Sequence, residues 1–153
     1  MSTRREAIRK SARLLAAAIL PETARAATGR ITVPFQYAAG RGSILVRAKI
    51  NGNTAVLIVD TGSSHVVVRP ELLGMRPSNV TPGVGVIGDA VGAEVSLELG
   101  GQVFAKHRVS IMDLSNALGF YKERVDGLLG IGFLLQFSQA SFDFKDRQVT
   151  LIF

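Results

Sequence analysis

The chain of 153 residues contains no cysteine and no tryptophan, and its only histidines are His65 and His107. Without cysteine it can form no disulfide bond, no thiolate metal site and no thiol nucleophile. Two histidines leave little basis for a histidine-rich metal site, and a Ser-His-Asp triad would have to use one of them. The sequence therefore implies no metal and no organic cofactor.

A strongly basic folded domain is also absent, although the formal net charge is +6. Residues 1–26 carry six basic and two acidic side chains, so this segment holds most of the net positive charge. The remaining chain has no stripe of Lys and Arg with interleaved aromatic residues, the pattern typical of nucleic-acid-binding surfaces. We therefore expect no nucleic-acid partner.

The basic N-terminal segment has the three parts of an export signal. Its basic residues are followed by a short apolar core, Ala12–Leu20, and then by small residues at Ala24 and Ala26. The core is shorter than the roughly 20 residues that cross a bilayer. The paired Arg4 and Arg5 leave a twin-arginine route open beside the general export route.

The expected organisation is therefore an export signal over residues 1–26, followed by one folded domain over residues 27–153. The expected location is a bacterial periplasm, with no membrane association unless the signal stays uncleaved. The alternative interpretation makes the N-terminal segment a short helix that belongs to the folded domain.

Apolar residues make up 47% of the chain and charged residues 20%, which is typical of a folded globular domain. Helical periodicity is scarce after residue 30, whereas β-branched residues are frequent, so we predict an all-β fold. Asn51 and Gly52 suit a tight hairpin turn, because both tolerate positive φ. The run Ala55–Asp60 is apolar on both faces and should be a central strand. One short helix is expected near Phe133, and a closing hairpin should turn at residues 145–147.

An ionisable side chain ends that central strand, in the sequence AVLIVDTGSSHVVV. Burial alone would drive the carboxyl group of Asp60 to its neutral form, unless neighbouring groups donate hydrogen bonds to it. Gly62 permits a sharp turn, and Thr61 and Ser63 supply hydroxyl groups beside backbone amides. An acid held in this way is available for acid–base chemistry on a water molecule.

One carboxylate cannot both activate water and protonate a substrate. Two carboxylates about 3 Å apart can do both, because like charges at that distance share a proton instead of both ionising. The chain shows only one Asp-Thr-Gly motif, so the second carboxylate would come from a second copy related by a two-fold axis.

A second motif, VDGLLGIGFL at Val125–Leu134, and a closing segment, FDFKDRQVTLIF at Phe142–Phe153, follow the first motif in order. The ordered set resembles the retropepsin-like aspartic proteases, the retroviral-type single-domain family, and most closely their exported bacterial branch. The resemblance implies a closed β-barrel or sandwich with a flap hairpin and one short helix near the C-terminus. Aspartic proteases are also the established example of a carboxylate pair that shares a proton.

By this resemblance Asp60 is the catalytic acid. The active-site loop is made by Thr61, Gly62 and Ser63, with the Thr61 hydroxyl locking two such loops together. The flap tip corresponds to Gly88–Gly92, with Gly88, Asp89 and Gly92 as its residues.

The second motif has a structural role in the family, carried in this chain by Leu128, Leu129 and Gly130. Gly132 departs from the family pattern, because many relatives have an aspartate at that position. The departure puts local packing in question more than activity.

The expected function is that of an aspartic endopeptidase which hydrolyses peptide or protein substrates as a homodimer. Terminal strands 31–36 and 147–153 form the interface by resemblance to the family. Two alternatives stay open: a non-catalytic peptide-binding module on the same fold, and a β-barrel in which Asp60 is purely structural.

Three other patterns are discounted. Residues 83–88 match a dinucleotide-binding glycine pattern, but the helix that such a site needs does not follow them. Asp126 has no hydroxyl neighbour and is expected to cap a turn instead of serving as a second acid. Ser64 and His65 are adjacent, and on a strand their side chains would point to opposite faces and not pair.

Overall fold

The computed structural model describes residues 29–76 and 91–153 of the chain. The expected export signal and two of the expected flap residues, Gly88 and Asp89, lie outside the described residues. The elements follow in the order β1 (Arg30–Tyr37), β2 (Ile44–Ile50), β3 (Asn53–Asp60), β4 (Val66–Val68), the 3₁₀ helix η2 (Pro70–Leu73), β5 (Val91–Leu99), β6 (Gln102–Ile111), α1 (Ser115–Leu118), β7 (Gly127–Gly130), α2 (Ile131–Leu134), β8 (Gln139–Asp143) and β9 (Gln148–Ile152).

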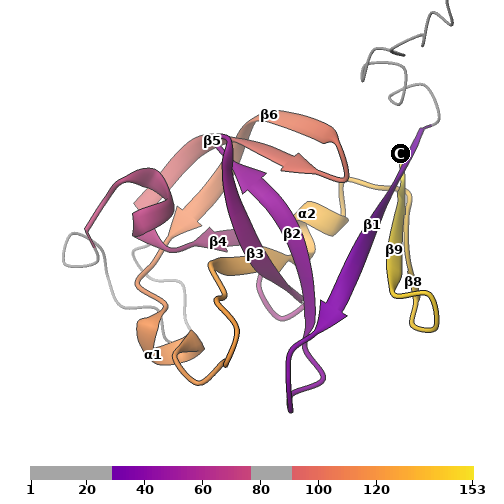
Figure 1. Cartoon of the computed structure of the whole chain (residues 1–153). Coiled ribbons are helices and arrows are strands. Elements are labelled where there is room, and N and C mark those ends of the chain that lie inside the picture. Colours follow the sequence, from indigo (N-terminus) through magenta and orange to yellow (C-terminus); the bar gives the residue numbers. More distant parts are fainter. Residues whose placement is uncertain (1–28, 77–90) are drawn as a thin grey trace, which may run out of the picture.

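Six of these strands close into a barrel (Figure 1). Around the ring, β3 pairs with β7, then β4, β6, β5 and β2 follow, and β2 pairs again with β3. Closure of this kind leaves the barrel without a terminal strand of the sort that ends an open sheet. The prediction of an all-β fold built on a closed barrel is confirmed.

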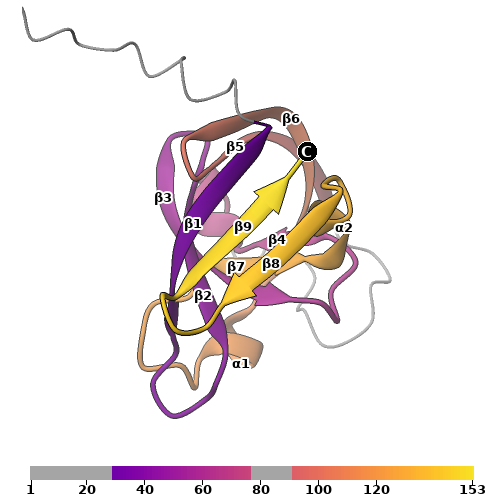
Figure 2. The same ribbon diagram turned by 90° about the vertical axis from the view of Figure 1, so that its right-hand side faces the viewer.

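The other three strands form a sheet that we call the arm, in the order β1, β9, β8 (Figure 2). β1 joins the arm to the barrel, because Phe35–Tyr37 pair with β2 while Arg30–Pro34 pair with β9. Pro34 lies where β1 changes partners, at a position where a missing backbone N–H is tolerated. β8 lies on the outer side of β9.

The strand that leads to the acidic motif is central, as its sequence predicts. β3 pairs with β2 on one side and with β7 on the other. Ala55 and Leu57 are fully buried within it. The tight turn before β3 has positive φ at both Asn51 (50°) and Gly52 (82°), which matches the right-handed twist of the flanking strands.

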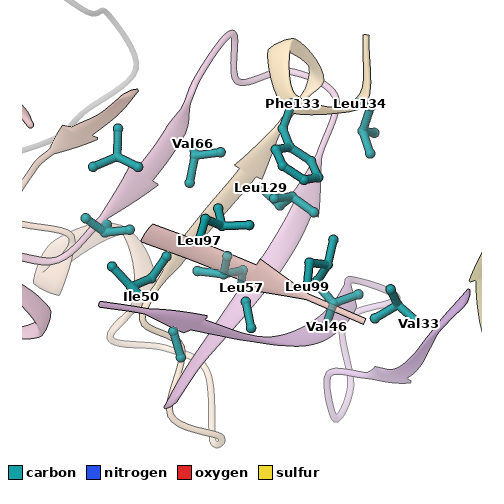
Figure 3. Close-up of a cluster of buried hydrophobic side chains, with 14 of the residues drawn as sticks. Val33, Val46, Ile50, Leu57, Val66, Leu97, Leu99, Leu129, Phe133 and Leu134 are labelled. Atoms are coloured by element: carbon teal, nitrogen blue, oxygen red, sulfur yellow. The ribbon is translucent and has the colours of Figure 1, made fainter. Parts of the chain in front are cut away.

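The main hydrophobic core fills the barrel and continues under the arm (Figure 3). Leu57, Leu97 and Leu129 contribute from three barrel strands, Val33 contributes from β1, and Phe133 contributes from α2. The predicted short helix at Phe133 is present as α2. The Phe133 side chain is buried, with 1% of its residue surface exposed. The core therefore ties α2 to the barrel wall.

The segment after β6 is rich in polar residues, yet it is not an irregular loop throughout. It contains the short helix α1, and Leu114 and Leu118 are buried in a second apolar cluster at one end of the barrel. Leu118 ends α1 and Leu114 is its N-cap residue. A helix of four residues is too short for its apolar pattern to be distinguished from a loop. Within residues 29–76 and 91–153, no helix is long and apolar enough to cross a membrane.

Candidate active site

Asp60 is the last residue of β3 and is partly buried. β3 and β7 run parallel, and the register places Asp60 beside Gly130 at the end of β7. The two predicted motifs therefore meet at one end of the barrel. Gly92, the third expected flap residue, is in β5 and pairs with Ser110 of β6.

The turn after Asp60 folds back over its carboxylate. The backbone amide of Gly62 donates a hydrogen bond of 2.8 Å to Oδ1 of Asp60. A Cβ atom at Gly62 would lie 3.1 Å from the same oxygen, so glycine allows this close approach. The amide of Ser63 donates to the backbone oxygen of Asp60 at 3.2 Å. The loop thus fixes one carboxylate oxygen through a backbone donor.

The hydroxyl groups of the loop have different environments. Ser63 Oγ donates to the backbone oxygen of His65 at 2.9 Å, so it holds the loop and does not serve the carboxylate. Thr61 is exposed, and its hydroxyl makes no hydrogen bond to the part of the chain that the structure describes. Of the two hydroxyl groups expected at the site, only that of Thr61 remains available.

The second motif contacts the active-site loop through backbone atoms. The amide of Ile131 donates to the backbone oxygen of Ser63 at 2.7 Å, which links the start of α2 to the loop. A Cβ atom at Gly130 would collide with the backbone oxygens of Ser63 and His65. Glycine is therefore required at this contact, and the expected structural role of Gly130 has a physical basis. Its neighbours Leu128 and Leu129 pack into the two apolar clusters.

Gly132 makes a similar contact. A Cβ atom there would collide with the backbone oxygen of Ser64. The loop backbone therefore occupies the space that any side chain at this position would need. The departure from the family pattern therefore accompanies a close backbone contact between α2 and the active-site loop.

The prediction that Ser64 and His65 do not pair is wrong. Ser64 Oγ lies 3.0 Å from Nδ1 of His65, at hydrogen-bond distance. The strand alternation behind that prediction does not apply, because β4 begins only at Val66 and both residues belong to the turn. Both side chains are exposed beside the Asp60 loop.

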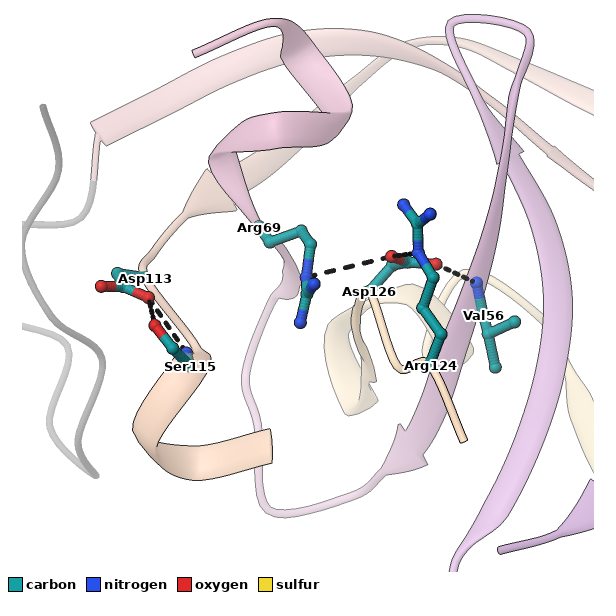
Figure 4. Close-up of polar contacts among 6 residues, drawn as sticks. All are labelled: Val56, Arg69, Asp113, Ser115, Arg124 and Asp126. Carbon is teal, nitrogen blue, oxygen red and sulfur yellow. Dashed lines mark hydrogen bonds and ion pairs between the residues drawn. The ribbon is translucent and has the colours of Figure 1, made fainter. Parts of the chain in front are cut away.

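Asp126 is buried, and both of its carboxylate oxygens accept hydrogen bonds (Figure 4). Its Oδ2 accepts from the Val56 amide at 3.0 Å, and its Oδ1 accepts from Arg124 Nε at 2.6 Å. Arg69 Nε lies 3.9 Å from Oδ1. These bonds join the loop before β7 to β3, which is a wider role than the expected turn cap. The bond to Asp126 also raises the pKa of Arg124.

Asp126 is also far from Asp60. Its amide donates to the backbone oxygen of Val56, four residues before Asp60 on β3. At roughly 3.3 Å per residue, the two aspartates are separated by about 13 Å along the strand. Asp126 therefore cannot share a proton with Asp60 of the same chain.

Two loops contact each other through residues that the sequence does not mark as neighbours. Ser43 lies just before β2, whose pairing with β3 begins at Leu45 and Ile58, and its Oγ is 2.8 Å from the Tyr121 hydroxyl. The Arg41 guanidinium lies 3.8 Å from the centre of the Phe120 ring. No local pattern could reveal these contacts, because the partners are 78 and 79 residues apart in the chain.

A cavity of about 550 Å³ lies elsewhere, at the β2–β3 turn and η2, lined by Asn51, Asn53, Thr54, Glu71, Leu72, Leu73, Gly74 and Arg124. This is the opposite end of β3 from Asp60, so the cavity is not part of the candidate active site. Among the described residues, no cluster of three or more His, Cys, Asp or Glu side chains could hold a metal ion.

Comparison with known proteins agrees with this geometry. A family model described as aspartyl protease matches residues 46–133, a stretch that includes Asp60 and Gly130. A solved structure, that of a retropepsin-like aspartic protease from Rickettsia conorii, is similar in fold, with a TM-score of 0.53 and 19% sequence identity. The likeness covers 80% of this chain and 89% of that one. No curated protein sequence matches the chain.

The family model spans more than half of the chain and contains both motifs that meet at the end of β3 and β7. The chain belongs to the aspartyl protease family and has the retropepsin-like fold.

Proposed function

We propose that the chain is an aspartic endopeptidase in which Asp60 from each of two copies forms one catalytic pair. The observation that carries this proposal is the single carboxylate at the end of β3. It is held by the Gly62 amide at 2.8 Å, while the nearest motif acid, Asp126, is occupied by Val56 and Arg124. The chemistry needs two carboxylates, and the described chain brings only one to the site.

The proposed reaction uses a water molecule and no cofactor. The pair shares one proton, because two carboxylates about 3 Å apart do not both ionise. The ionised member takes a proton from water, whose oxygen attacks the peptide carbonyl carbon, while the protonated member donates its proton to the carbonyl oxygen. The member that took the proton from water then donates it to the amide nitrogen, the other member takes a proton from a hydroxyl group of the tetrahedral intermediate, and cleavage of the C–N bond releases a carboxylic acid and an amine.

The loop residues have separate roles in this proposal. The Gly62 amide orients the Asp60 carboxylate, and the Ser63 hydroxyl fixes the loop through His65. The free Thr61 hydroxyl is available to bond the loop of the second copy. Residues 88–92, which include Gly88, Asp89 and Gly92, are proposed to form the flap tip that covers a bound peptide.

The proposed setting is the one that the N-terminal sequence suggests. Residues 1–26 act as an export signal, and residues 27–153 form the protease domain in a bacterial periplasm. Both assignments are tested by N-terminal sequencing of the protein recovered from the periplasm of an expressing bacterium.

Cleavage of an unfolded protein at mildly acidic pH tests the activity. Wild type should cleave it, and Asp60→Asn should not, because the amide can neither share nor transfer the proton. Asp146→Asn is the matched control, since Asp146 is exposed on the turn between β8 and β9. Equal inactivity of wild type and Asp60→Asn, in a protein shown to be dimeric, would instead favour a peptide-binding module.

A further inference from the structure

The cavity at the β2–β3 turn and η2 borders a stretch of β3 that has a strand on one side only. β3 pairs with β2 from Asn53 onward, but its pairing with β7 begins only at Leu57. Between these points, the amide and the oxygen of Val56 both bond to Asp126. Within the described part of the chain, residues 53–55 therefore have no strand beside them on that edge.

The backbone of Thr54 points to this open edge. The turn between β2 and β3 contains two residues, so successive residues of β3 bond alternately toward β2 and away from it. Thr54 and Val56 share the second orientation, and the outward bonds of Val56 to Asp126 agree with it. The N–H and C=O of Thr54 are thus directed outward, beside the cavity that Thr54 helps to line.

The guanidinium group of Arg124 lies at the end of this open stretch. Its Nε donates to Oδ1 of Asp126 at 2.6 Å, while Oδ2 of Asp126 accepts from the Val56 amide. Figure 4 shows the two terminal nitrogens of Arg124 pointing away from Asp126. They make no hydrogen bond to the residues that the structure describes, and the side chain is 68% exposed. Two such nitrogens form the planar fork that fits a carboxylate.

A negative charge also lines the cavity. Glu71 in η2 is exposed, and its carboxylate has no partner among the described residues. The pKa of Arg124 is raised mainly by its bond to Asp126, and the charge of Glu71 raises it further. Glu71 and Arg124 are therefore within electrostatic range of each other, and both are available to a ligand that carries two opposite charges.

We propose that this cavity binds the carboxyl-terminal end of an extended peptide that finishes in lysine or arginine. The peptide backbone pairs with the N–H and C=O of Thr54, its terminal carboxylate accepts hydrogen bonds from Arg124, and its last side chain lies against Glu71. Strand addition and capture of a terminal carboxylate are both recurring modes of peptide recognition. The volume of about 550 Å³ lies within the range of about 300–1,000 Å³ that small-ligand sites have.

The geometry favours a chain end over an internal segment. The loop before β7 closes the open edge at Val56 through Asp126, so an added strand has to stop there. Arg124 stands at that stop, and its positive charge attracts a carboxylate and repels an ammonium group. The peptide therefore runs parallel to β3, with its carboxyl end toward Val56.

Binding of short peptides to the full-length protein tests the site. The probe is acetylated Ala-Ala-Lys with a free carboxylate, and the same peptide with a carboxyl-terminal amide is its control. In an NMR titration, the acid should bind with a dissociation constant of about 1 mM, in keeping with few contacts in an open site. The amide should bind about tenfold more weakly, because it loses the charge-assisted hydrogen bonds. The backbone amide signals of Thr54 and Gly74 should shift, and that of Gly62 should not.

Two variants test the charged partners. Arg124→Gln should weaken binding of the acid about tenfold and remove the difference between acid and amide. Arg108→Gln is the matched control, since Arg108 is exposed on β6 and does not line the cavity. Glu71→Gln should remove the preference for Ala-Ala-Lys over Ala-Ala-Glu, whereas Glu94→Gln, an exposed change on β5, should retain it.

The outcomes separate this site from the proposed catalytic pair, because the cavity lies at the opposite end of β3 from Asp60. Equal affinity for acid and amide, shifts centred on Gly62, or no binding at millimolar peptide would overturn the cavity proposal and leave the protease assignment standing. Asp60→Asn should bind the peptide as wild type does. A protein that binds the acid selectively and shows no Asp60-dependent cleavage would support the cavity site and overturn the activity.

Discussion

The amide of Val56 donates a hydrogen bond of 3.0 Å to Oδ2 of Asp126, so a carboxylate that is 1% exposed joins the loop before β7 to β3. Asp126→Ala should lower the free energy of unfolding by about 3 kcal/mol, because it leaves a buried amide unpaired and separates Arg69 and Arg124 from their counter-ion. Urea denaturation measures the loss.

Arg124→Ala is the comparison for that variant. The Arg124 side chain is 68% exposed, and Arg69 remains 3.9 Å from the Asp126 carboxylate when Arg124 is removed. Arg124→Ala should lower the free energy of unfolding by about 1 kcal/mol or less, as for other solvent-exposed ion pairs. Equal losses for Arg124→Ala and Asp126→Ala would contradict the view that the bond to the Val56 amide matters most.

Burial lowers the pKa of His107 below its ordinary value of 6.5, where the imidazole packs edge-on against Phe133 at a ring distance of 5.4 Å. The unfolded chain therefore binds this proton more readily than the folded chain does. The free energy of unfolding is unaffected by His107 well above pH 6.5, falls as the pH drops from 6.5 toward the lowered folded pKa, and levels off below that pKa. His107→Gln should flatten this slope in urea titrations at pH 7, 6 and 5.

His65→Gln is the matched control, because His65 is exposed on the active-site loop and away from the core. It should leave the pH slope of stability in place. A slope that disappears in His65→Gln and persists in His107→Gln would contradict the assignment. Although Lys106 and Arg108 flank His107 in the sequence, its ring contacts Phe133 instead of lying free in solvent.

The backbone contact between Gly132 and Ser64 predicts a strong cost for any side chain at residue 132. Gly132→Ala should lower the free energy of unfolding by about 1–3 kcal/mol, because the new Cβ must push away the Ser64 oxygen. Cleavage should fall with it, since the same loop carries Asp60. Gly92→Ala is the control for stability alone, with a Cβ no closer than 3.7 Å to the described neighbours. Thermal unfolding of the two variants compares them directly.

Much of the site could be predicted because its signals are local. The turn at Asn51 and Gly52, the apolar strand into Asp60 and the glycine at position 130 each have a short sequence pattern with a physical cause. The Ser64–His65 pair was missed because a strand was assumed where a turn exists. The Ser43–Tyr121 contact depends on how distant segments close the barrel, which no local pattern records.

The Ser43–Tyr121 contact can be measured by a double-mutant cycle. Ser43→Ala and Tyr121→Phe each remove one hydroxyl from a hydrogen bond of 2.8 Å. Each substitution should lower the free energy of unfolding by about 1 kcal/mol. The double variant should lose less than the sum of the two, because the hydrogen bond can be lost only once. Strict additivity of the three urea-derived free energies would show that the two hydroxyl groups do not interact in solution.

The proposed pair of Asp60 side chains makes dimerisation depend on pH. Two facing carboxylates bind one shared proton more tightly than two separate chains bind theirs, so the dimer takes up a proton as it forms. Dimerisation should therefore weaken as the pH rises from mildly acidic to alkaline, where both carboxylates ionise and repel each other. Asp60→Asn removes the titrating pair, so its dissociation constant should stay constant over the same range, while Asp146→Asn should follow wild type. Sedimentation equilibrium measures all three, and equal pH dependence in wild type and Asp60→Asn would place the two carboxylates apart.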